Sequence, residues 1–227
     1  MKVWMRVRAL GDSASVMRRD DAALPPRDEQ LTWVDRVADA LDAVSPSRAS
    51  GAHSAENRRS ACVRSFAREG ARVADVVERQ VPLALADQAD LVFIMAGTHE
   101  LLAGRSSPET LADRVDASVA ELRGAGSDVV LISTLATSSA LVPRRRLEGS
   151  AEFTSELWWI ARARGATVVD AWSIPDVRAR PLGAVERVTL DAAGHRMLAR
   201  RVIEALGVPY RDGLLPPVSE AASRLPG

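Results

Sequence analysis

Three short segments of the sequence gather the residue types that nucleophilic and acid–base chemistry need. They are Gly11-Asp12-Ser13, Arg68-Glu69-Gly70 and Gly97-Thr98-His99-Glu100. A serine hydroxyl becomes a useful nucleophile when a base stands beside it. A histidine is the side chain whose charge changes most readily near neutral pH. A site built from these segments could therefore support nucleophilic attack or proton transfer.

The hydrophobic pattern places each of these segments directly after a predicted strand. Apolar runs of strand length occur at about residues 3–10, 61–67, 90–96, 128–134 and 166–171. Amphipathic stretches of helix length occur at about residues 30–44, 71–85, 108–123, 150–164 and 191–206. This alternation predicts an α/β protein, a three-layer α/β/α sandwich with a five-stranded parallel sheet. Ligands of such sheets bind outside the carboxyl ends of the strands, so we expect the three segments to meet at one edge.

Composition and charge exclude several classes of function. The 227 residues are 47% hydrophobic and 26% charged, as in ordinary globular domains. Lys plus Arg and Asp plus Glu both number 30, so the formal net charge is +0, which argues against nucleic acid or an anionic membrane as partner. No apolar run approaches the roughly 20 residues that a membrane span needs. The expected partner is a small-molecule substrate, and no oligomeric state is predicted.

The cysteine count bears on location and cofactors. Cys62 is the single cysteine, which excludes an internal disulfide and favours a cytoplasmic protein. One cysteine and three histidines also argue against a Cys-based zinc site. The sequence has neither a P-loop nor a dinucleotide-binding glycine pattern. We therefore predict no metal and no organic cofactor.

In their order along the chain, the motifs resemble those of the SGNH (GDSL-type) hydrolases. The resemblance covers residues 3 to about 208. It rests on Leu10-Gly11-Asp12-Ser13, on Gly70, on Gly97-Thr98-His99-Glu100 and on the closing stretch ERVTLDAAGHRMLARRV. It implies a flavodoxin-like α/β/α fold, with an SGNH-hydrolase-like domain over residues 1–208. We expect residues 209–227 to form an irregular, Pro-containing C-terminal arm.

The resemblance also implies a reaction, the hydrolysis of acyl esters. In this family the serine that matches Ser13 attacks the carbonyl, and a histidine takes the serine's proton. An aspartate three residues before that histidine orients it. The oxyanion is held by the serine N–H, by the N–H of the glycine that matches Gly70, and by an asparagine amide. Each such donor is worth on the order of 10²–10³ in rate.

The sequence departs from the family pattern at the residues that matter most. Aligning the closing stretch on its helix start places Glu186 in the aspartate position and Thr189 in the histidine position. His99 stands in the asparagine position, and Glu100 follows it. Ser13 and Gly70 are retained, whereas the usual base and the amide donor are absent. The resemblance therefore implies an eroded, degenerate catalytic triad.

Two sets of residues could replace the missing base. His99 could approach Ser13 as a base, oriented by Glu186 or Glu100, or could donate a ring N–H to the oxyanion. Alternatively, Asp191 and His195 could form the catalytic dyad. A Gly-His pair at a helix start is better suited to a structural role, with Asp191 as the N-cap.

Three functions are compatible with these observations. The leading prediction is an ester or acyl hydrolase that acts on a small acylated metabolite through Ser13. The alternative is a non-hydrolytic enzyme of small-molecule biosynthesis, a cyclase, lyase or dehydratase, in which His99 and Glu186 transfer protons. The second alternative is a catalytically inactive binding or partner subunit.

Overall fold

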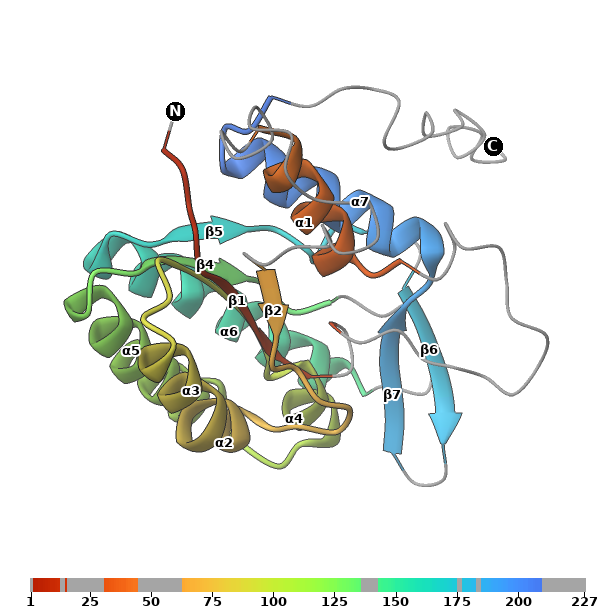
Figure 1. Cartoon of the computed structure of the whole chain (residues 1–227). Helices are drawn as coiled ribbons and strands as arrows, with labels where there is room; N and C mark the ends of the chain where they lie inside the picture. The colour runs from red at the N-terminus through yellow and green to blue at the C-terminus, as the bar shows by residue number, and fades with distance from the viewer. Residues whose placement is uncertain are drawn as a thin grey trace.

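A five-stranded parallel sheet covered by helices on both faces forms the body of the computed structural model (Figure 1). The structure describes residues 2–12, 15, 31–44, 63–135, 143–174, 177–182 and 185–209, with residues 177–182 and 185–189 described by their backbone alone. The strands are β1 (Val7–Gly11), β2 (Val63–Ser65), β3 (Leu91–Met95), β4 (Asp128–Ile132) and β5 (Thr167–Val169). Their order is β2-β1-β3-β4-β5. The predicted α/β/α class is confirmed, and the order reverses between β1 and β3, where open sheets of this kind bind ligands.

Alternation of side chains along the strands gives the sheet two buried faces. In β3, Leu91, Phe93 and Met95 pack into one core cluster, whereas Val92 and Ile94 pack into the other. Every residue of β3 is buried. A strand that is buried on both faces has a continuous apolar sequence, which explains why this element is the clearest strand in the sequence.

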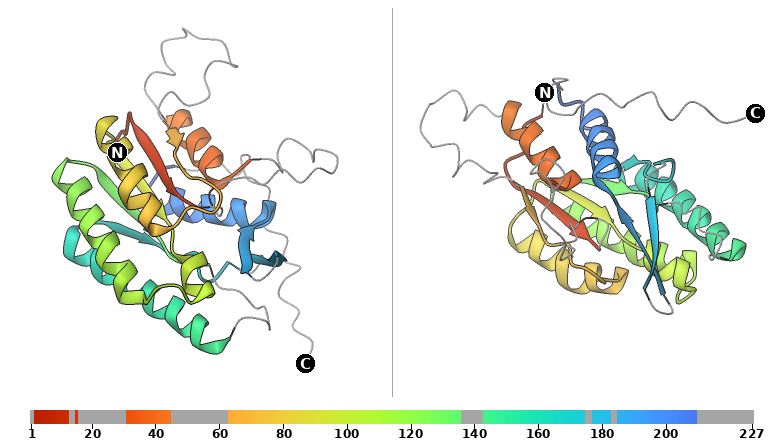
Figure 2. Two further views of the ribbon diagram at one scale, coloured as in Figure 1. Left: turned by 90° about the horizontal axis from the view of Figure 1, so that it is seen from below. Right: turned by 90° about the vertical axis from the view of Figure 1, so that its right-hand side faces the viewer.

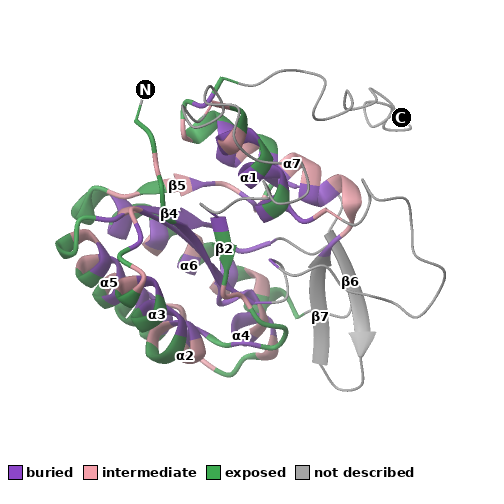
Figure 3. Ribbon diagram, viewed as in Figure 1, coloured by how far each residue is buried: buried purple, intermediate pink, exposed green. Residues whose placement is uncertain are grey.

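Two helices cover one face and the remaining long helices cover the other (Figures 2 and 3). The first face carries α1 (Trp33–Val44) and α7 (Ala192–Ala205), which share a core with the side chains of Leu91, Phe93 and Met95. The other face carries α2 (Val73–Asp75), the π-helical segment η4 (Val76–Gln80), α3 (Val81–Ala86), α5 (Pro108–Gly124) and α6 (Arg144–Arg164). The short helix α4 (Thr98–Ala103) follows β3. The Trp33 and Phe93 rings meet edge to face, with centroids 5.6 Å apart.

Several element boundaries differ from those expected. β1 begins at Val7 rather than residue 3, because the N–H groups of Met5 and Arg6 donate to the Asp90 side chain instead of entering a strand ladder. α1 begins at Trp33 rather than residue 30, since Thr32 Oγ1 accepts the Asp35 N–H and caps the helix. α6 begins at Arg144 rather than residue 150, and its first turns are largely exposed, so they lack an apolar period.

A β-hairpin outside the main sheet was not expected from the sequence. Its strands, β6 (Val177–Leu182) and β7 (Val185–Leu190), are antiparallel and form a separate two-stranded sheet. The hairpin projects beyond the five-stranded sheet (Figure 1). β7 contacts α4, and it leads directly into α7. The hairpin therefore brings the closing motif of the chain next to the helix that follows β3.

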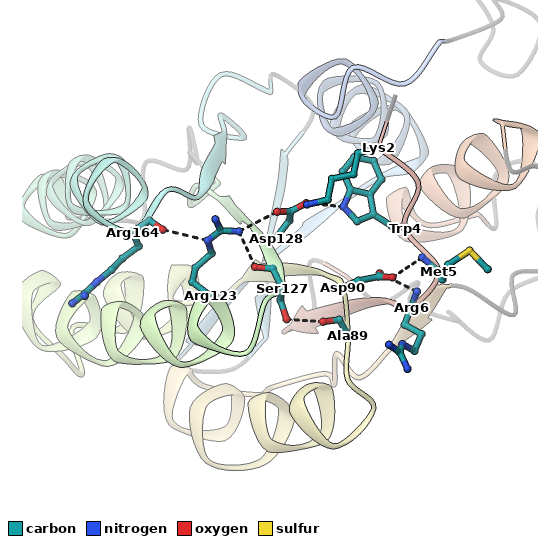
Figure 4. A network of polar contacts seen from close by, with 10 residues as sticks. All are labelled: Lys2, Trp4, Met5, Arg6, Ala89, Asp90, Arg123, Ser127, Asp128 and Arg164. Carbon is teal, nitrogen blue, oxygen red and sulfur yellow. Dashed lines mark hydrogen bonds and ion pairs between the residues drawn. The ribbon is translucent and has the colours of Figure 1, made fainter.

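A polar network fixes the amino ends of the strands (Figure 4). Asp128, at the start of β4, accepts the Trp4 indole N–H at 2.8 Å and forms an ion pair with Lys2. Asp90 accepts the N–H groups of Met5 and Arg6 at 2.7 and 2.9 Å. These contacts hold the segment before β1 at the end of the sheet opposite the carboxyl ends of the strands.

Two further predictions concern membrane-spanning helices and the C-terminal arm. None of the helices in the described ranges combines the length and the apolar character that crossing a bilayer requires. Residues 210–227, most of the predicted C-terminal arm, lie outside the described residues. The division into a domain over 1–208 and an arm over 209–227 stays a prediction.

Candidate active site

The first motif lies where β1 and β3 end side by side. Gly11 is paired with Met95, and the Asp12 N–H donates to the carbonyl oxygen of Met95 at 3.3 Å. The Ser15 N–H donates to the carbonyl oxygen of Asp12 at 3.1 Å. Asp12 and Ser15 are both buried. Ser13 and Ala14 lie outside the described residues, and the structure describes Asp12 before them and Ser15 after them.

Gly11 is a glycine because β3 leaves no room for a side chain there. Its φ is +155°, and an added Cβ would lie 2.3 Å from the carbonyl oxygen of Met95. Any side chain would therefore push the end of β1 away from β3. The close approach of the two strand ends depends on this one residue.

A buried glutamine that was not among the predicted site residues holds both backbone groups of Gly11. The Gly11 N–H donates to Gln80 Oε1 at 2.8 Å, and Gln80 Nε2 donates to the Gly11 carbonyl oxygen at 3.0 Å. Gln80 is 3% exposed and is the last residue of η4. The sequence feature that could have pointed to Gln80 is its position two residues before Pro82, within a stretch of otherwise helical sequence.

The second motif forms a turn that is tied to both other motifs. The Arg68 N–H donates to the carbonyl oxygen of Gly11 at 3.2 Å, and the Ala71 N–H closes the turn on the Arg68 carbonyl at 3.1 Å. Gly70 lies inside this turn with φ +75°, and the space around its Cβ position is open. Beyond the turn, the Val73 N–H donates to Glu100 Oε2 at 3.0 Å.

Glu100 is thus a buried carboxylate that anchors the Gly70 turn to α4. It is 5% exposed. Burial raises the pKa of its carboxyl group above the ordinary value, and the Val73 N–H and the nearby Arg72 oppose that rise. The hypothesis that Glu100 orients His99 remains untested, whereas its bond to Val73 gives it a structural role.

His99 lies in the first turn of α4, directly after the carboxyl end of β3. It is half-buried. Gly97 precedes the helix with φ +99°, and Thr98 Oγ1 accepts the Leu135 N–H at 3.3 Å. The backbone hydrogen bond between Arg68 and Gly11, and the bond from the Val73 N–H to the Glu100 side chain, thus bring the three predicted segments to one edge of the sheet.

The closing motif reaches the same edge through β7. Glu186 and Thr189, which the motif alignment places in the family's aspartate and histidine positions, both lie on β7, paired in register with Pro181 and Arg178. Because β7 contacts α4 (Figure 1), the backbone of this motif lies beside the helix that carries His99. Their catalytic roles remain predictions.

Asp191 and His195, the alternative dyad, have structural partners. Asp191 Oδ1 accepts the Gly194 N–H at 2.9 Å and caps α7. His195 is 1% exposed, and its Nδ1 accepts the Trp33 N–H at 3.2 Å. Burial, together with the nearby Arg36 charge, lowers the pKa of His195 to about 4, against the opposing effects of Asp191 and Asp35. His195 is therefore neutral at pH 7 and joins α7 to α1.

An apolar hollow of about 440 Å³ lies elsewhere on the surface. Its lining residues come from the second half of α6 and the amino end of β5, and they are Trp158, Trp159, Ala161, Arg162, Ala166 and Val168. Both tryptophans are exposed. Since the three motifs follow the carboxyl ends of β1, β2 and β3, this hollow is separate from the candidate site.

The sequence matches the model of the GDSL-like Lipase/Acylhydrolase family over residues 9–197. That range includes the first three motifs, both strands of the hairpin and the start of α7. The chain belongs to the GDSL-like lipase/acylhydrolase family. The resemblance found in the motifs is therefore confirmed.

Solved structures of an esterase, of an alpha/beta hydrolase enzyme and of a G-D-S-L family protein share the fold at low sequence identity. A catalytic mutant of the acetylxylan esterase Axe2 from Geobacillus stearothermophilus has a TM-score of 0.66 and 18% identity, covering 93% of this chain and 99% of the esterase chain. An alpha/beta hydrolase enzyme from the metagenome of Lake Arreo, Spain, has a TM-score of 0.67 and 16% identity, with coverages of 93% and 99%. A putative lipolytic G-D-S-L protein from Desulfitobacterium hafniense has a TM-score of 0.61 and 14% identity, covering 88% and 99%. Among curated proteins, no sequence matches this chain.

Proposed function

We propose that this protein is an acyl-ester hydrolase that uses Ser13 as its nucleophile and His99 as its proton acceptor. The observation that supports the proposal best is the set of bonds joining the motifs. Gly11 bonds to Arg68 in the second motif, and Val73, after that motif, bonds to Glu100 in the third. These bonds hold the backbone that follows β1, β2 and β3 in one arrangement.

In the proposed reaction, the Ser13 hydroxyl oxygen attacks the ester carbonyl while His99 accepts the hydroxyl proton. The carbonyl oxygen becomes an oxyanion, and the Gly70 N–H donates to it. When the ester C–O bond breaks, the leaving alkoxide takes the proton from the His99 imidazolium. Water then cleaves the acyl-serine by the same sequence, with His99 again as the base.

We choose His99 as the base because of its position relative to the three motifs. Among the described residues, His195 is buried and bonded to Trp33, whereas His99 is half-buried at the edge where the motifs meet. Thr189 occupies the family's histidine position and is no base near neutral pH. Glu186 lies on β7, beside α4, and we propose that it orients the His99 ring.

We propose a small acylated metabolite as substrate, with a short acyl group such as acetyl. An esterase of acetyl-xylooligosaccharides is among the proteins that share the fold, at 17% identity. Acetyl esters are therefore the first compounds to assay.

The test is steady-state hydrolysis of p-nitrophenyl acetate by the wild type, Ser13→Ala and His99→Ala. Removing the nucleophile should lower kcat/KM at least about 100-fold, and removing the base should cost about 10²–10⁴. Matched Tm values for the three proteins would show that folding is not the cause. Equal turnover by the wild type and Ser13→Ala would contradict the proposal.

The threonine that the motif alignment places in the family's histidine position, Thr189, favours a second candidate, proton transfer without a nucleophile. In that case His99 and Glu186 would act as acid and base in a cyclisation, elimination or dehydration of a small molecule. Ser13→Ala would then keep its activity, whereas His99→Ala would lose it. An inactive binding subunit would bind its ligand, and neither the wild type nor either variant would turn that ligand over.

A further inference from the structure

β1 extends beyond its neighbour β2 at the edge where the motifs meet. The register between the two strands ends with Ala9 paired to Ser65, whereas β1 continues to Gly11. Past that point the Gly11 N–H has a side chain as its partner, Oε1 of Gln80 at 2.8 Å. The same amide returns a donor, Nε2, to the Gly11 carbonyl at 3.0 Å. A buried glutamine therefore does at this position what a strand residue does elsewhere in the sheet.

The Gly11 carbonyl is also the junction between the first and second motifs. Besides Gln80 Nε2, it accepts the Arg68 N–H at 3.2 Å. Arg68 begins the turn that contains Gly70, and Asp12 and Ser13 follow Gly11 directly. A single peptide group thus sets the position of the Gly70 turn relative to the chain that carries Ser13.

The local helix geometry places Gln80 for this task. Gln80 ends a π-helical segment, and Pro82 follows two residues later. Proline has no N–H, and its ring crowds the carbonyl of the preceding turn. A π turn is wider than an α turn, and such segments occur frequently at functional sites. Here the wide turn ends with its one buried amide side chain against β1.

We propose that Gln80 is a positioning residue for ester hydrolysis, which fixes the backbone of Ser13 relative to the Gly70 N–H. This inference rests on the proposed function for its catalytic consequence. Those two backbone N–H groups are the ones assigned to the oxyanion, so their separation must suit the tetrahedral intermediate rather than the ground state. Gln80 touches neither the substrate nor the reacting atoms and acts through Gly11.

The role requires a neutral group with one acceptor and one donor in the same plane. A methionine has the length of glutamine but offers neither partner to Gly11. A carboxylate accepts the Gly11 N–H but repels the Gly11 carbonyl, whereas a protonated carboxyl group supplies both partners. Gln80→Glu should therefore work while its buried carboxyl is protonated and fail when it ionises. Burial raises the pKa of such a carboxyl group, which moves this change toward neutral pH.

The experiment compares the wild type, Gln80→Met, Gln80→Glu and Ser118→Ala. Ser118 is an equally buried polar residue in α5 whose hydroxyl donates to Arg114 in its own helix. Its removal controls for the loss of a hydrogen bond made by a buried side chain. We measure kcat and KM for p-nitrophenyl acetate from pH 5.5 to 8.5, Tm, and hydrogen exchange of the Gly11 amide.

For Gln80→Met we expect kcat to fall roughly 10- to 100-fold, with KM changed less than about threefold. The Gly11 amide should exchange at least about tenfold faster than in the wild type. Ser118→Ala should change neither quantity, even where its Tm falls equally. The kcat of Gln80→Glu, divided by that of the wild type, should fall as the pH rises, because the buried carboxyl group ionises. The ratio is used because it cancels the titration of the base that both proteins share.

Each result decides the inference. Unchanged Gly11 exchange in Gln80→Met would overturn it, and so would faster exchange with undiminished kcat. A flat Gln80→Glu ratio would contradict the donor-and-acceptor requirement. If the wild type hydrolyses no ester, the proposed function fails on its own, and Gly11 exchange still decides whether Gln80 fixes this backbone.

Discussion

The backbone N–H of Trp33 donates to Nδ1 of His195 at 3.2 Å, and this bond joins the start of α1 to the first turn of α7. An imidazole nitrogen that accepts a hydrogen bond carries no proton, so the proton of neutral His195 is on Nε2. Both helices lie on the same face of the sheet. The histidine of the helix-opening Gly-His pair is therefore part of the packing between two helices.

This histidine predicts how stability depends on pH. Its pKa is about 4 in the folded protein, because of burial and the nearby Arg36, against 6.5 for an unperturbed histidine. Between these values the unfolded chain binds a proton that the folded state excludes. The contribution of His195 to the free energy of unfolding is therefore fully present above pH 6.5 and is lost as the pH falls toward 4. The full effect is about 3 kcal/mol.

The measurement is urea unfolding at pH 7.5 and pH 5, for the wild type and His195→Gln. Glutamine offers an acceptor to Trp33 but does not titrate. Acidification to pH 5 should cost the wild type about 2 kcal/mol more than the variant. Equal losses in the two proteins would show that His195 titrates normally.

Glu100 predicts the opposite slope with pH. Burial raises its pKa, so between the ordinary value and the raised one the folded state keeps a proton that the unfolded chain releases. Stability from this group is present at low pH and is lost as the pH rises through the folded pKa. Glu100→Gln keeps an acceptor for the Val73 N–H and should remove this slope.

Glu100→Ala leaves the buried Val73 N–H without its partner. We expect the free energy of unfolding to fall by about 1–3 kcal/mol relative to Glu100→Gln. Urea unfolding of both variants at one pH tests this directly. Equal stability of the alanine and glutamine variants would mean that the bond to Val73 contributes nothing.

Two glycines of the site should respond differently to alanine. Gly11→Ala places a Cβ 2.3 Å from the Met95 carbonyl oxygen, so the ends of β1 and β3 must separate. Gly70→Ala meets only the strain of φ +75°, about 1 kcal/mol. Thermal unfolding should rank Gly11→Ala well below Gly70→Ala. Similar Tm values would show that β1 and β3 tolerate a wider spacing.

Asp90 provides a control remote from the site. Its carboxylate accepts the N–H groups of Met5 and Arg6 at the opposite end of the sheet. Asp90→Ala should lower stability by about 1 kcal/mol and leave kcat and KM for ester hydrolysis unchanged. A change in kcat at constant Tm would show that the two ends of β1 are coupled.

Restoring the family's histidine should increase activity. Thr189 is the residue that the motif alignment places in that position, and its strand, β7, contacts α4. If Ser13 and the Gly70 N–H are correctly placed, Thr189→His should raise kcat/KM by about tenfold or more. Thr189→Gln, which adds bulk without a base, is the matched control. An equal response of both variants would remove the base from the explanation.

The body of the fold was predictable because both sheet faces are covered. Strands such as Leu91–Met95 are apolar throughout, and amphipathic helices separate them. The hairpin was not predictable, since Val177–Leu182 contains two arginines and a proline, and its alternation of apolar and charged residues is confined to the first four positions. Its two strands pair with each other and not with the five-stranded sheet.

The candidate site was predictable in its motifs and not in its supports. The carboxyl ends of parallel strands meet at one edge of the sheet, so Gly11, Gly70 and Gly97 could be expected together. Gln80 could not, because a polar residue in a helical stretch usually faces solvent. It is buried here because β1 extends past the end of β2 and leaves the Gly11 N–H in need of an acceptor.

The central claim is that Ser13 forms a bond with the acyl group. Its most direct test is the intact mass of the protein after brief reaction with a fluorophosphonate, combined with peptide mapping. We predict stoichiometric labelling of the wild type on Ser13, much slower labelling of His99→Ala, and none of Ser13→Ala. An unlabelled wild type, or a label on another residue, would contradict the claim.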